Sequence, residues 1–277
     1  MDTTLRYESN SGVNIEFAPD SAYHYSGATL HDYAHGYESS GGRITQWTQD
    51  ITDWTLDAVV AGSTAEDRNA MIEAFEYDVL KMQPGKLWSG DYYLECYVTA
   101  SSKDLWWSDE GLMHASLTIT AEKPRWVREF FKVFGDGRRD DDDTGIDYMH
   151  DWAFDYANNL SISFAKNTGI VEAPFRMCVY GPTPDTVQII IGHNVYAVDV
   201  VLKKGELLTI DSREKTIVLT KADGTTENLF AKRVGTQRVG SGSYTFESIK
   251  PGSNTVSWSQ KYVFDLTVYD ERAEPRW

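Results

Sequence analysis

The chain has 277 residues, with 26 Lys and Arg against 42 Asp and Glu, so its formal net charge at pH 7 is −16. A protein this acidic, with a pI near 4.7, is a poor candidate for coating nucleic acid or an anionic membrane. Its 9 Trp, 16 Tyr and 11 Phe residues exclude a disordered chain, because disordered segments are poor in aromatic side chains.

The length allows one large or two modest domains, each with its own hydrophobic core. No apolar run approaches the roughly 20 residues that span a bilayer, and the first residues lack the basic and apolar regions of a secretory signal. Cys96 and Cys178 lie far apart, in no spacing typical of a metal site or a disulfide framework. We therefore expect a protein made in a reducing cytoplasm, without membrane contact and with two inert thiols.

The first segment of unusual composition covers about residues 16–54 and is rich in Tyr, His, Gly and Ser. It contains Tyr23, Tyr25, Tyr33 and Tyr37 but few aliphatic side chains, so it cannot form a core alone. Amphipathic aromatic side chains are enriched at interfaces. Two interpretations stay open: an extended hairpin or arm that packs on a neighbouring subunit, and an irregular loop that covers the sheet of its own domain.

The next segment predicts a helix. Ser63 with Glu66 three residues later forms a capping box, and Pro84-Gly85 ends the run. Between them, apolar residues recur at helical spacing at Met71, Ile72, Phe75, Val79 and Leu80. One amphipathic helix among many strands indicates a mainly β protein with that helix packed on a sheet.

Short strands dominate the rest of the chain. Alternation or β-branched residues predict them at residues 92–100, 115–121, 177–180, 187–191, 195–202, 216–220 and 262–269. Asp223-Gly224 lies between two such runs and predicts a β-hairpin. Strands about 8–12 residues apart, separated by turn residues, favour a β-sandwich or barrel in the second half.

A composition change divides the two halves. Residues 135–145 contain no apolar side chain, and their glycines and four consecutive aspartates favour a solvated linker. We therefore predict an N-terminal domain at residues 1–134, an acidic linker at 135–147 and a C-terminal domain at 148–277.

The search for chemistry finds no catalytic, cofactor or metal site. Asp140–Asp143 lack the spacing of a calcium loop, and a solvated linker is the better interpretation. His31 and His35 stand four apart without the Glu of a zinc motif. The glycine-rich residues 235–243 precede a strand and not a helix, which argues against a phosphate-binding loop.

The order of several motifs resembles the distal tail protein (Dit) family of long-tailed, siphovirus-type phages and prophages. The matching stretches are 83–87, 90–98, 115–120 and 123–129, which contains a Pro-x-Trp motif, then 205–212, 215–217, 228–230, 246–249 and the Pro-Gly-x-Asn turn within 250–254. Each motif alone is weak, and their order and spacing carry the resemblance from about residue 63 onward.

The resemblance implies an N-terminal β-sheet or split-barrel domain with one packed helix, and a C-terminal galectin-like β-sandwich. In that family the N-terminal domains form a hexameric ring that connects the tail tube to the tail hub or baseplate, and the outer domain often docks receptor-binding proteins. It thus implies a non-enzymatic structural protein at the tail tip of the virion, made in the host bacterial cytoplasm, with no cofactor. Its partners would be copies of itself, the tail tube protein, the hub protein and, in some particles, a receptor-binding protein.

Two further expectations concern surfaces. If genomic DNA passes through the ring without specific binding, a negative lining would help by repelling its phosphates. The aromatic residues that we expect at subunit contacts are Tyr23, Tyr25, Tyr33, Tyr37, Trp106, Trp107 and Trp126. The alternative function is a carbohydrate-binding module for attachment to the host surface, for which Trp106-Trp107 would offer sugar-stacking rings.

Overall fold

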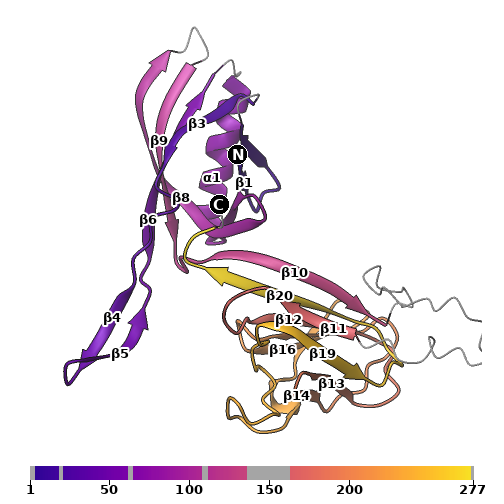
Figure 1. Ribbon diagram of the computed structural model, residues 1–277. Helices are drawn as coiled ribbons and strands as arrows, with labels where there is room; N and C mark the ends of the chain where they lie inside the picture. The colour runs from indigo at the N-terminus through magenta and orange to yellow at the C-terminus, as the bar shows by residue number, and fades with distance from the viewer. Residues whose placement is uncertain (1–3, 19–20, 62–64, 108–111, 136–162, 276–277) are drawn as a thin grey trace, which may run out of the picture. The chain divides into compact units, whose positions relative to one another are not determined.

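The computed structural model describes residues 4–18, 21–61, 65–107, 112–135 and 163–275, and the side chains of residues 104–107 lie outside this description (Figure 1). The chain forms two compact units. Unit 1 comprises Met1–Arg128 and Glu271–Trp277, and unit 2 comprises Glu129–Asp270. Both are built mainly from β-strands, and within the described residues there is one α-helix, as the sequence predicts.

Unit 1 is a closed barrel of seven strands in the order β8-β7-β1-β2-β3-β6-β9, with β9 pairing back onto β8. The strands are β1 (Leu5–Glu8), β2 (Asn14–Phe17), β3 (Tyr23–Ala28), β6 (Thr52–Val60), β7 (Gly85–Ser89), β8 (Tyr92–Trp107) and β9 (Leu112–Ala121). Buried and partly exposed residues alternate along the whole of β9, which is the period of two that a strand with one buried face requires. The circuit closes between β2 and β3 through a single pair, Phe17 with Tyr23, so the other residues of β3 pair on one side only, with β6.

Helix α1 (Ala65–Lys81) packs on the barrel. The side chains that it buries are Met71, Ala74, Phe75 and Asp78, and the Phe75 ring meets the Tyr7 ring edge-on at 5.1 Å. The predicted apolar stripe is therefore correct for Met71 and Phe75. It is wrong for Ile72, Val79 and Leu80, which are exposed, because a polar residue occupies the buried face one turn after Phe75. The predicted cap Ser63 lies outside the described residues.

The helix ends in a Schellman motif just before Pro84, where the sequence predicts its end. The backbone N–H of Gln83 donates to the carbonyl of Asp78, and that of Met82 donates to the carbonyl of Val79. Met82 takes the left-handed conformation, with φ of 53°, that glycine usually supplies at this position. The Asn10 side chain holds the chain that follows by donating to the carbonyls of Gln83 and Pro84.

The buried polar residue on α1 is Asp78, which is 0% exposed. Its carboxylate accepts hydrogen bonds from the Tyr7 hydroxyl at 2.8 Å, from the Ser9 hydroxyl at 3.0 Å and from the backbone N–H of Asn10 at 2.9 Å. Burial, with further contributions from Cys96 and Asp78, raises the pKa of the Tyr7 hydroxyl far above its ordinary value. Tyr7 therefore stays a donor, and the carboxylate joins the helix to the β1–β2 turn of the barrel.

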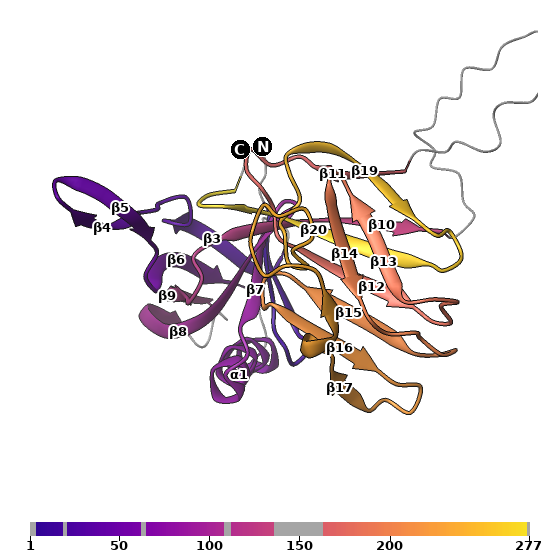
Figure 2. The same cartoon turned by 90° about the horizontal axis from the view of Figure 1, so that it is seen from below.

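Unit 2 is a sandwich of two sheets (Figure 2). One has the order β17-β16-β15-β12-β20-β10 and the other β11-β19-β13-β14-β18. The strands are β10 (Trp126–Phe134), β11 (Ser163–Asn167), β12 (Phe175–Tyr180), β13 (Val187–Ile191), β14 (Asn194–Val198), β15 (Leu207–Asp211), β16 (Thr216–Thr220), β17 (Thr226–Asn228), β18 (Arg233–Val234), β19 (Gly252–Trp258) and β20 (Phe264–Arg272).

The core of the sandwich comes from the alternating residues that the sequence indicates. Phe175, Met177 and Val179 on β12 are 0% exposed and share a core cluster with Ile189 and Phe264. The predicted hairpin at Asp223-Gly224 is confirmed, because β16 pairs with β17 around that turn and Gly224 has φ of 84°.

The division of the chain differs from the predicted one. The predicted linker lies largely within residues 136–162, outside the described residues. The structure changes unit between Arg128 and Glu129, inside strand β10, and again between Asp270 and Glu271, inside β20. Composition gives no signal at these points, because each strand continues unbroken from one unit to the other. Among the described residues, no helix combines the length and the apolar character needed to cross a membrane.

We predict that Asp78→Ala lowers the free energy of unfolding by about 3 kcal/mol, because it removes the acceptor of two buried hydroxyls, Tyr7 and Ser9, and of the partly buried Asn10 N–H. The matched control is Glu73→Ala on the exposed side of the same helix, which should change stability by no more than about 0.5 kcal/mol. Urea unfolding followed by tryptophan fluorescence measures both, since Trp54 and Trp126 report on unit 1. Equal effects of the two variants would contradict a structural role for the carboxylate.

Candidate interaction surfaces

The arm predicted from the Tyr-rich segment is a regular hairpin. Strands β4 (Gly36–Ser40) and β5 (Arg43–Thr48) form a two-stranded sheet of their own, which projects from the barrel of unit 1 (Figure 1). Gly41 and Gly42 both have positive φ, of 59° and 75°, as a two-residue type I′ turn requires. Of the two interpretations of this segment, the structure favours the hairpin over the irregular loop. The hairpin covers fewer residues than the predicted arm of about 16–54, because β2, β3 and β6 belong to the barrel.

This hairpin, residues 36–48, has no hydrophobic core. No residue of either strand is buried, and Tyr37, Ile44 and Trp47 are 61%, 48% and 63% exposed. Tyr37 and Trp47 lie opposite each other in register, with ring centroids 6.2 Å apart. An isolated two-stranded hairpin is marginally stable in water, so this pair cannot account for the hairpin on its own. It has the properties of a segment completed by another surface.

The base of the hairpin is tied firmly to the barrel. The Trp54 indole N–H donates to the carbonyl of Asp32 at 2.7 Å, and Arg125 Nε donates to Gln49 Oε1 at 2.6 Å. Trp54 is itself buried in the barrel core. Trp54 thus holds the segment that leads into the hairpin, and Arg125 holds the segment that leads out of it.

A second apolar surface of unit 1 lies on helix α1. Its members are exposed although they belong to a packed helix: Ile72, Tyr77, Val79 and Leu80 on the helix, and Met82 directly after it. We call these residues the outer helix face. Leu80 is 74% exposed, and the Lys81 ammonium lies 5.7 Å from the centre of the Tyr77 ring. Because the Asp78 side of the helix faces the barrel, these apolar residues face solvent.

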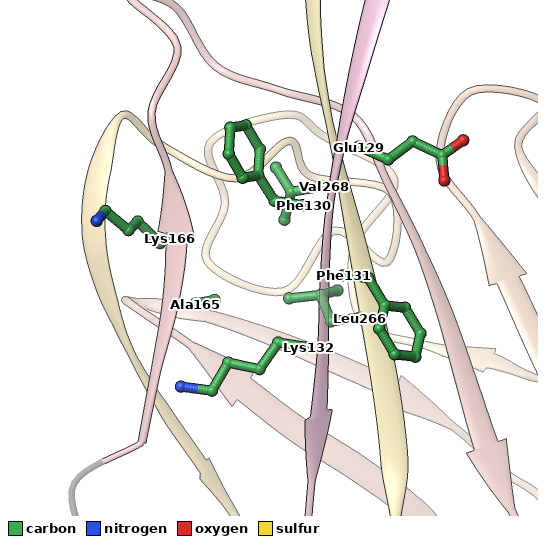
Figure 3. A pocket seen from close by; sticks show the side chains of 8 residues that line it. All are labelled: Glu129, Phe130, Phe131, Lys132, Ala165, Lys166, Leu266 and Val268. Atoms are coloured by element: carbon green, nitrogen blue, oxygen red, sulfur yellow. The ribbon is translucent and has the colours of Figure 1, made fainter. Parts of the chain in front are cut away.

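Unit 2 carries a groove between the edges of its two sheets. A cavity of about 360 Å3 lies among β10, β11 and β20 and is lined by Glu129, Phe130, Phe131, Lys132, Ala165, Lys166, Leu266 and Val268 (Figure 3). Lys132 and Lys166 extend on the same side of β10, whereas Glu129 and Phe131 extend on the other. The Lys132 ammonium lies 5.3 Å from the centre of the Phe134 ring. The groove is open and lined by aliphatic stems, and it lacks a converging set of catalytic groups.

A small polar cluster lies on the outer side of the larger sheet of unit 2. The Tyr180 hydroxyl donates to Asp265 Oδ2 at 2.5 Å, and this hydrogen bond, together with burial, raises the pKa of Tyr180 to about 12. Burial and the nearby Asp265 carboxylate also raise the pKa of the Cys178 thiol. A carboxylate beside the thiol disfavours the thiolate, so this cluster opposes nucleophilic chemistry. Burial likewise raises the pKa of Cys96.

The aromatic residues predicted at subunit contacts lie in different environments. Tyr33 and Tyr37 lie in or next to the hairpin and are exposed. Tyr23 and Tyr25 lie in barrel strand β3, where the Tyr23 hydroxyl donates to the carbonyl of Asp67 and the ring packs on the core. Trp126 is 0% exposed in the core of unit 1, so this candidate is wrong as a contact residue.

Trp106 and Trp107 end strand β8, but their side chains lie outside the described residues, as do Asp140–Asp143. Ile44 and Trp47 were missed, because they stand three residues apart and the register shift between Glu38 and Ser39 that puts them on one face leaves no period of two in the sequence. Over the described part of the chain, no group of three or more His, Cys, Asp or Glu residues is placed to hold a metal ion.

The sequence matches no protein-family model, and no curated protein is significantly similar to it. Its fold recurs in solved structures of phage tail proteins. SPP1 Dit (gp 19.1), described as a paradigm of the hub adsorption apparatus in phages that infect Gram-positive bacteria, is 11% identical, with a TM-score of 0.54 over 98% of this chain and 100% of that chain.

Chains of the phage P2 baseplate in its activated conformation are similar to the same degree. The structure with Ca is 12% identical, with a TM-score of 0.56 over 99% of this chain and 100% of that chain. The structure with Sr is 12% identical, with a TM-score of 0.55 over 98% and 99%. The likeness extends over both units, so the chain has the fold of phage tail and baseplate proteins and, more particularly, a Dit-like fold.

We predict that Asp265→Asn lowers the pKa of Cys178, because it removes the carboxylate that disfavours the thiolate. The rate at which Cys178 reacts with a disulfide reagent at pH 8 should rise roughly threefold, since the gain in thiolate exceeds the loss in nucleophilicity. Cys96, which is 0% exposed, provides the internal control and should stay unreactive. An unchanged rate for Cys178 would show that burial alone protects this thiol.

Proposed function

We propose that this chain is a structural protein of a phage tail tip, a distal tail protein. Copies of it form a hexameric ring through unit 1, and the ring connects the tail tube to the tail hub or baseplate. The observation that carries the proposal is the Dit-like fold, which extends over almost all of this chain and of the solved tail proteins. The motif order in the sequence points to the same family.

The hairpin of residues 36–48 supports assembly into a ring. Its exposed Tyr37, Ile44 and Trp47 lack a core of their own, as expected for a segment that is completed by another copy. Contacts between unlike surfaces of identical subunits continue from one copy to the next. They form a closed ring when a whole number of these rotations makes a full turn. A stable ring of this kind needs no cofactor and no reacting group.

The acidic balance of the chain fits a passage for DNA. A bore lined by carboxylates repels the phosphate backbone, so genomic DNA passes without specific binding. The net charge of −16 is compatible with such a lining. A binding site for nucleic acid would need the opposite sign, with Lys and Arg gathered on one surface.

Unit 2 is the candidate surface for further tail proteins, including a receptor-binding protein. The alternative of a carbohydrate-binding module needs exposed aromatic rings on which a sugar can stack. Trp258 does not offer one, because its indole N–H donates to the carbonyl of Tyr262 and its ring packs against Phe134 and Phe264. Phe131 and Tyr180 of unit 2 are exposed, so the carbohydrate-binding alternative stays open. A glycan array tests the remaining possibility directly.

We predict that native mass spectrometry of the purified chain detects a six-copy assembly at micromolar concentration. The double variant Tyr37→Ala/Trp47→Ala should raise the concentration needed for assembly by roughly tenfold or more, as loss of buried aromatic contacts does at interfaces. The matched control is Phe131→Ala in unit 2, because Phe131 is 64% exposed and Trp47 is 63% exposed. A chain that stays monomeric, alone and with neighbouring tail proteins, would overturn the proposed function.

A further inference from the structure

We propose that the groove of unit 2 is the docking site of the chain's own residues 146–156, which add to strand β11 as an antiparallel edge strand. The aromatic side chains of this segment fill the groove, and its aspartates lie beside Lys166. The inference concerns unit 2 alone and does not depend on the proposed ring.

The sequence of the segment is that of a strand with one aromatic and one acidic face. Every second residue is a large side chain: Ile146, Tyr148, His150, Trp152, Phe154 and Tyr156. The positions between them hold three acids and two other side chains: Asp147, Met149, Asp151, Ala153 and Asp155. A sustained period of two indicates a strand whose two faces meet different surroundings. The aromatic face needs an apolar surface to cover.

The groove offers an apolar floor of the matching kind. Its most buried lining residues are Leu266 and Val268 of β20 and Ala165 of β11, which are 1%, 2% and 2% exposed. Phe130 of β10 also lines it and packs partly on the core of the sandwich. The cavity of about 360 Å3 is therefore apolar where it is most buried, as rings from a covering strand require.

Strand β11 provides the backbone partners. It is the last strand of its sheet, and among the described strands it pairs with β19 alone. The Gly192 N–H donates to the carbonyl of Thr255, so Thr255 of β19 faces β13, and its two neighbours along β19 face β11. By the same alternation, Phe164 and Lys166 of β11 direct their backbone groups away from β19. Such an edge is where an extended segment joins a sheet.

The position of the segment in the chain favours this strand over any other. Only residues 157–162 separate it from β11, and they contain Asn158-Asn159. Connections about this short join the antiparallel strands of a hairpin, and Asn is favoured in their turns. Residues 135–145, which precede the segment, are long enough to run back along β11 as a solvated loop. The short tether gives the segment a high effective concentration beside the groove of its own copy.

The faces of β11 determine which way the segment points. Ala165 is buried, whereas Lys166 is exposed on the opposite face of the strand. Paired strands share their faces, so aromatic side chains directed to the groove leave the aspartates on the side of Lys166. The Lys132 ammonium already lies 5.3 Å from the centre of the Phe134 ring, and further rings suit it equally. The acid among the lining residues, Glu129, extends on the other side of β10 (Figure 3).

Disulfide formation tests this pairing in the full-length chain. Lys166→Cys is combined, in separate variants, with a cysteine on the acidic face of the segment: Asp151→Cys, Ala153→Cys or Asp155→Cys. All variants also carry Cys178→Ser, and Cys96 is buried. One of the three pairs should form a disulfide within one chain, because directly opposed residues of paired strands have Cα atoms about 5.5 Å apart. Peptide mass spectrometry without reduction identifies the bond, whose yield should not change on dilution.

The aromatic face provides the matched control. Trp152→Cys and Phe154→Cys lie in the same segment, but their side chains point to the groove, so neither should form a disulfide with Lys166→Cys. Equal yields at all five positions would show a segment without a fixed face and would overturn the inference. It would fail equally if no pair formed a disulfide, or if the disulfides joined two copies and so gave the groove to the segment of another chain.

Hydrogen exchange provides a second measurement, with the cysteines left native. The backbone amides of residues 148–156 should have protection factors at least about tenfold higher than in the double variant Trp152→Ser/Phe154→Ser. Lys166→Glu should lower this protection roughly threefold, because it sets a like charge beside the aspartates. Lys204→Glu, at another exposed position of unit 2, is the matched control and should change nothing. A segment that exchanges equally fast in all four chains would overturn the docking.

Discussion

The buried carboxylate of Asp78 determines how helix α1 is rotated on its barrel, and the surface of unit 1 depends on that rotation. A fully buried charge is tolerated only when its oxygens are satisfied, and here Tyr7, Ser9 and Asn10 provide the donors. With this residue facing inward, Met71, Ala74 and Phe75 follow on the same side. Apolar residues elsewhere on the helix, such as Val79 and Leu80, are then left in solvent.

This arrangement explains an apparent contradiction in the helix. Val79 and Leu80 are exposed, although both are far more apolar than Asp78, which the helix buries. Exposed apolar patches of this kind mark interaction sites in other proteins, and the assembly proposed above would give this face such a role. The hairpin has the complementary problem, since it holds aromatic side chains at the end of two strands that bury nothing.

The sequence predicted those features that depend on short-range pattern. Strand alternation located β12, β13 and β16, and Asp223-Gly224 located a hairpin, because turn chemistry and the period of two are local properties. The closed barrel could not be predicted in this way, because the pairing of β8 with β9 and of β1 with β7 depends on residues far apart in the chain. The buried face of α1 was missed for a related reason, since the partners of Asp78 come from a turn 68 to 71 residues earlier. Trp126 was expected at an interface because Trp is enriched there, but the same large apolar ring also fills a core.

The charge of the chain and its exposed apolar surfaces act against each other in assembly. Like charges on copies that carry −16 each repel at long range, and this repulsion keeps free subunits apart in spite of their apolar patches. Repulsion between exposed charges falls off beyond about 8 Å at physiological salt, whereas packing of Trp47 or Leu80 against a partner acts only at contact. Random encounters are therefore opposed, and only an encounter that packs apolar side chains together would be retained. The same balance would suit the ring proposed above, because carboxylates that no contact covers would remain available to line its passage.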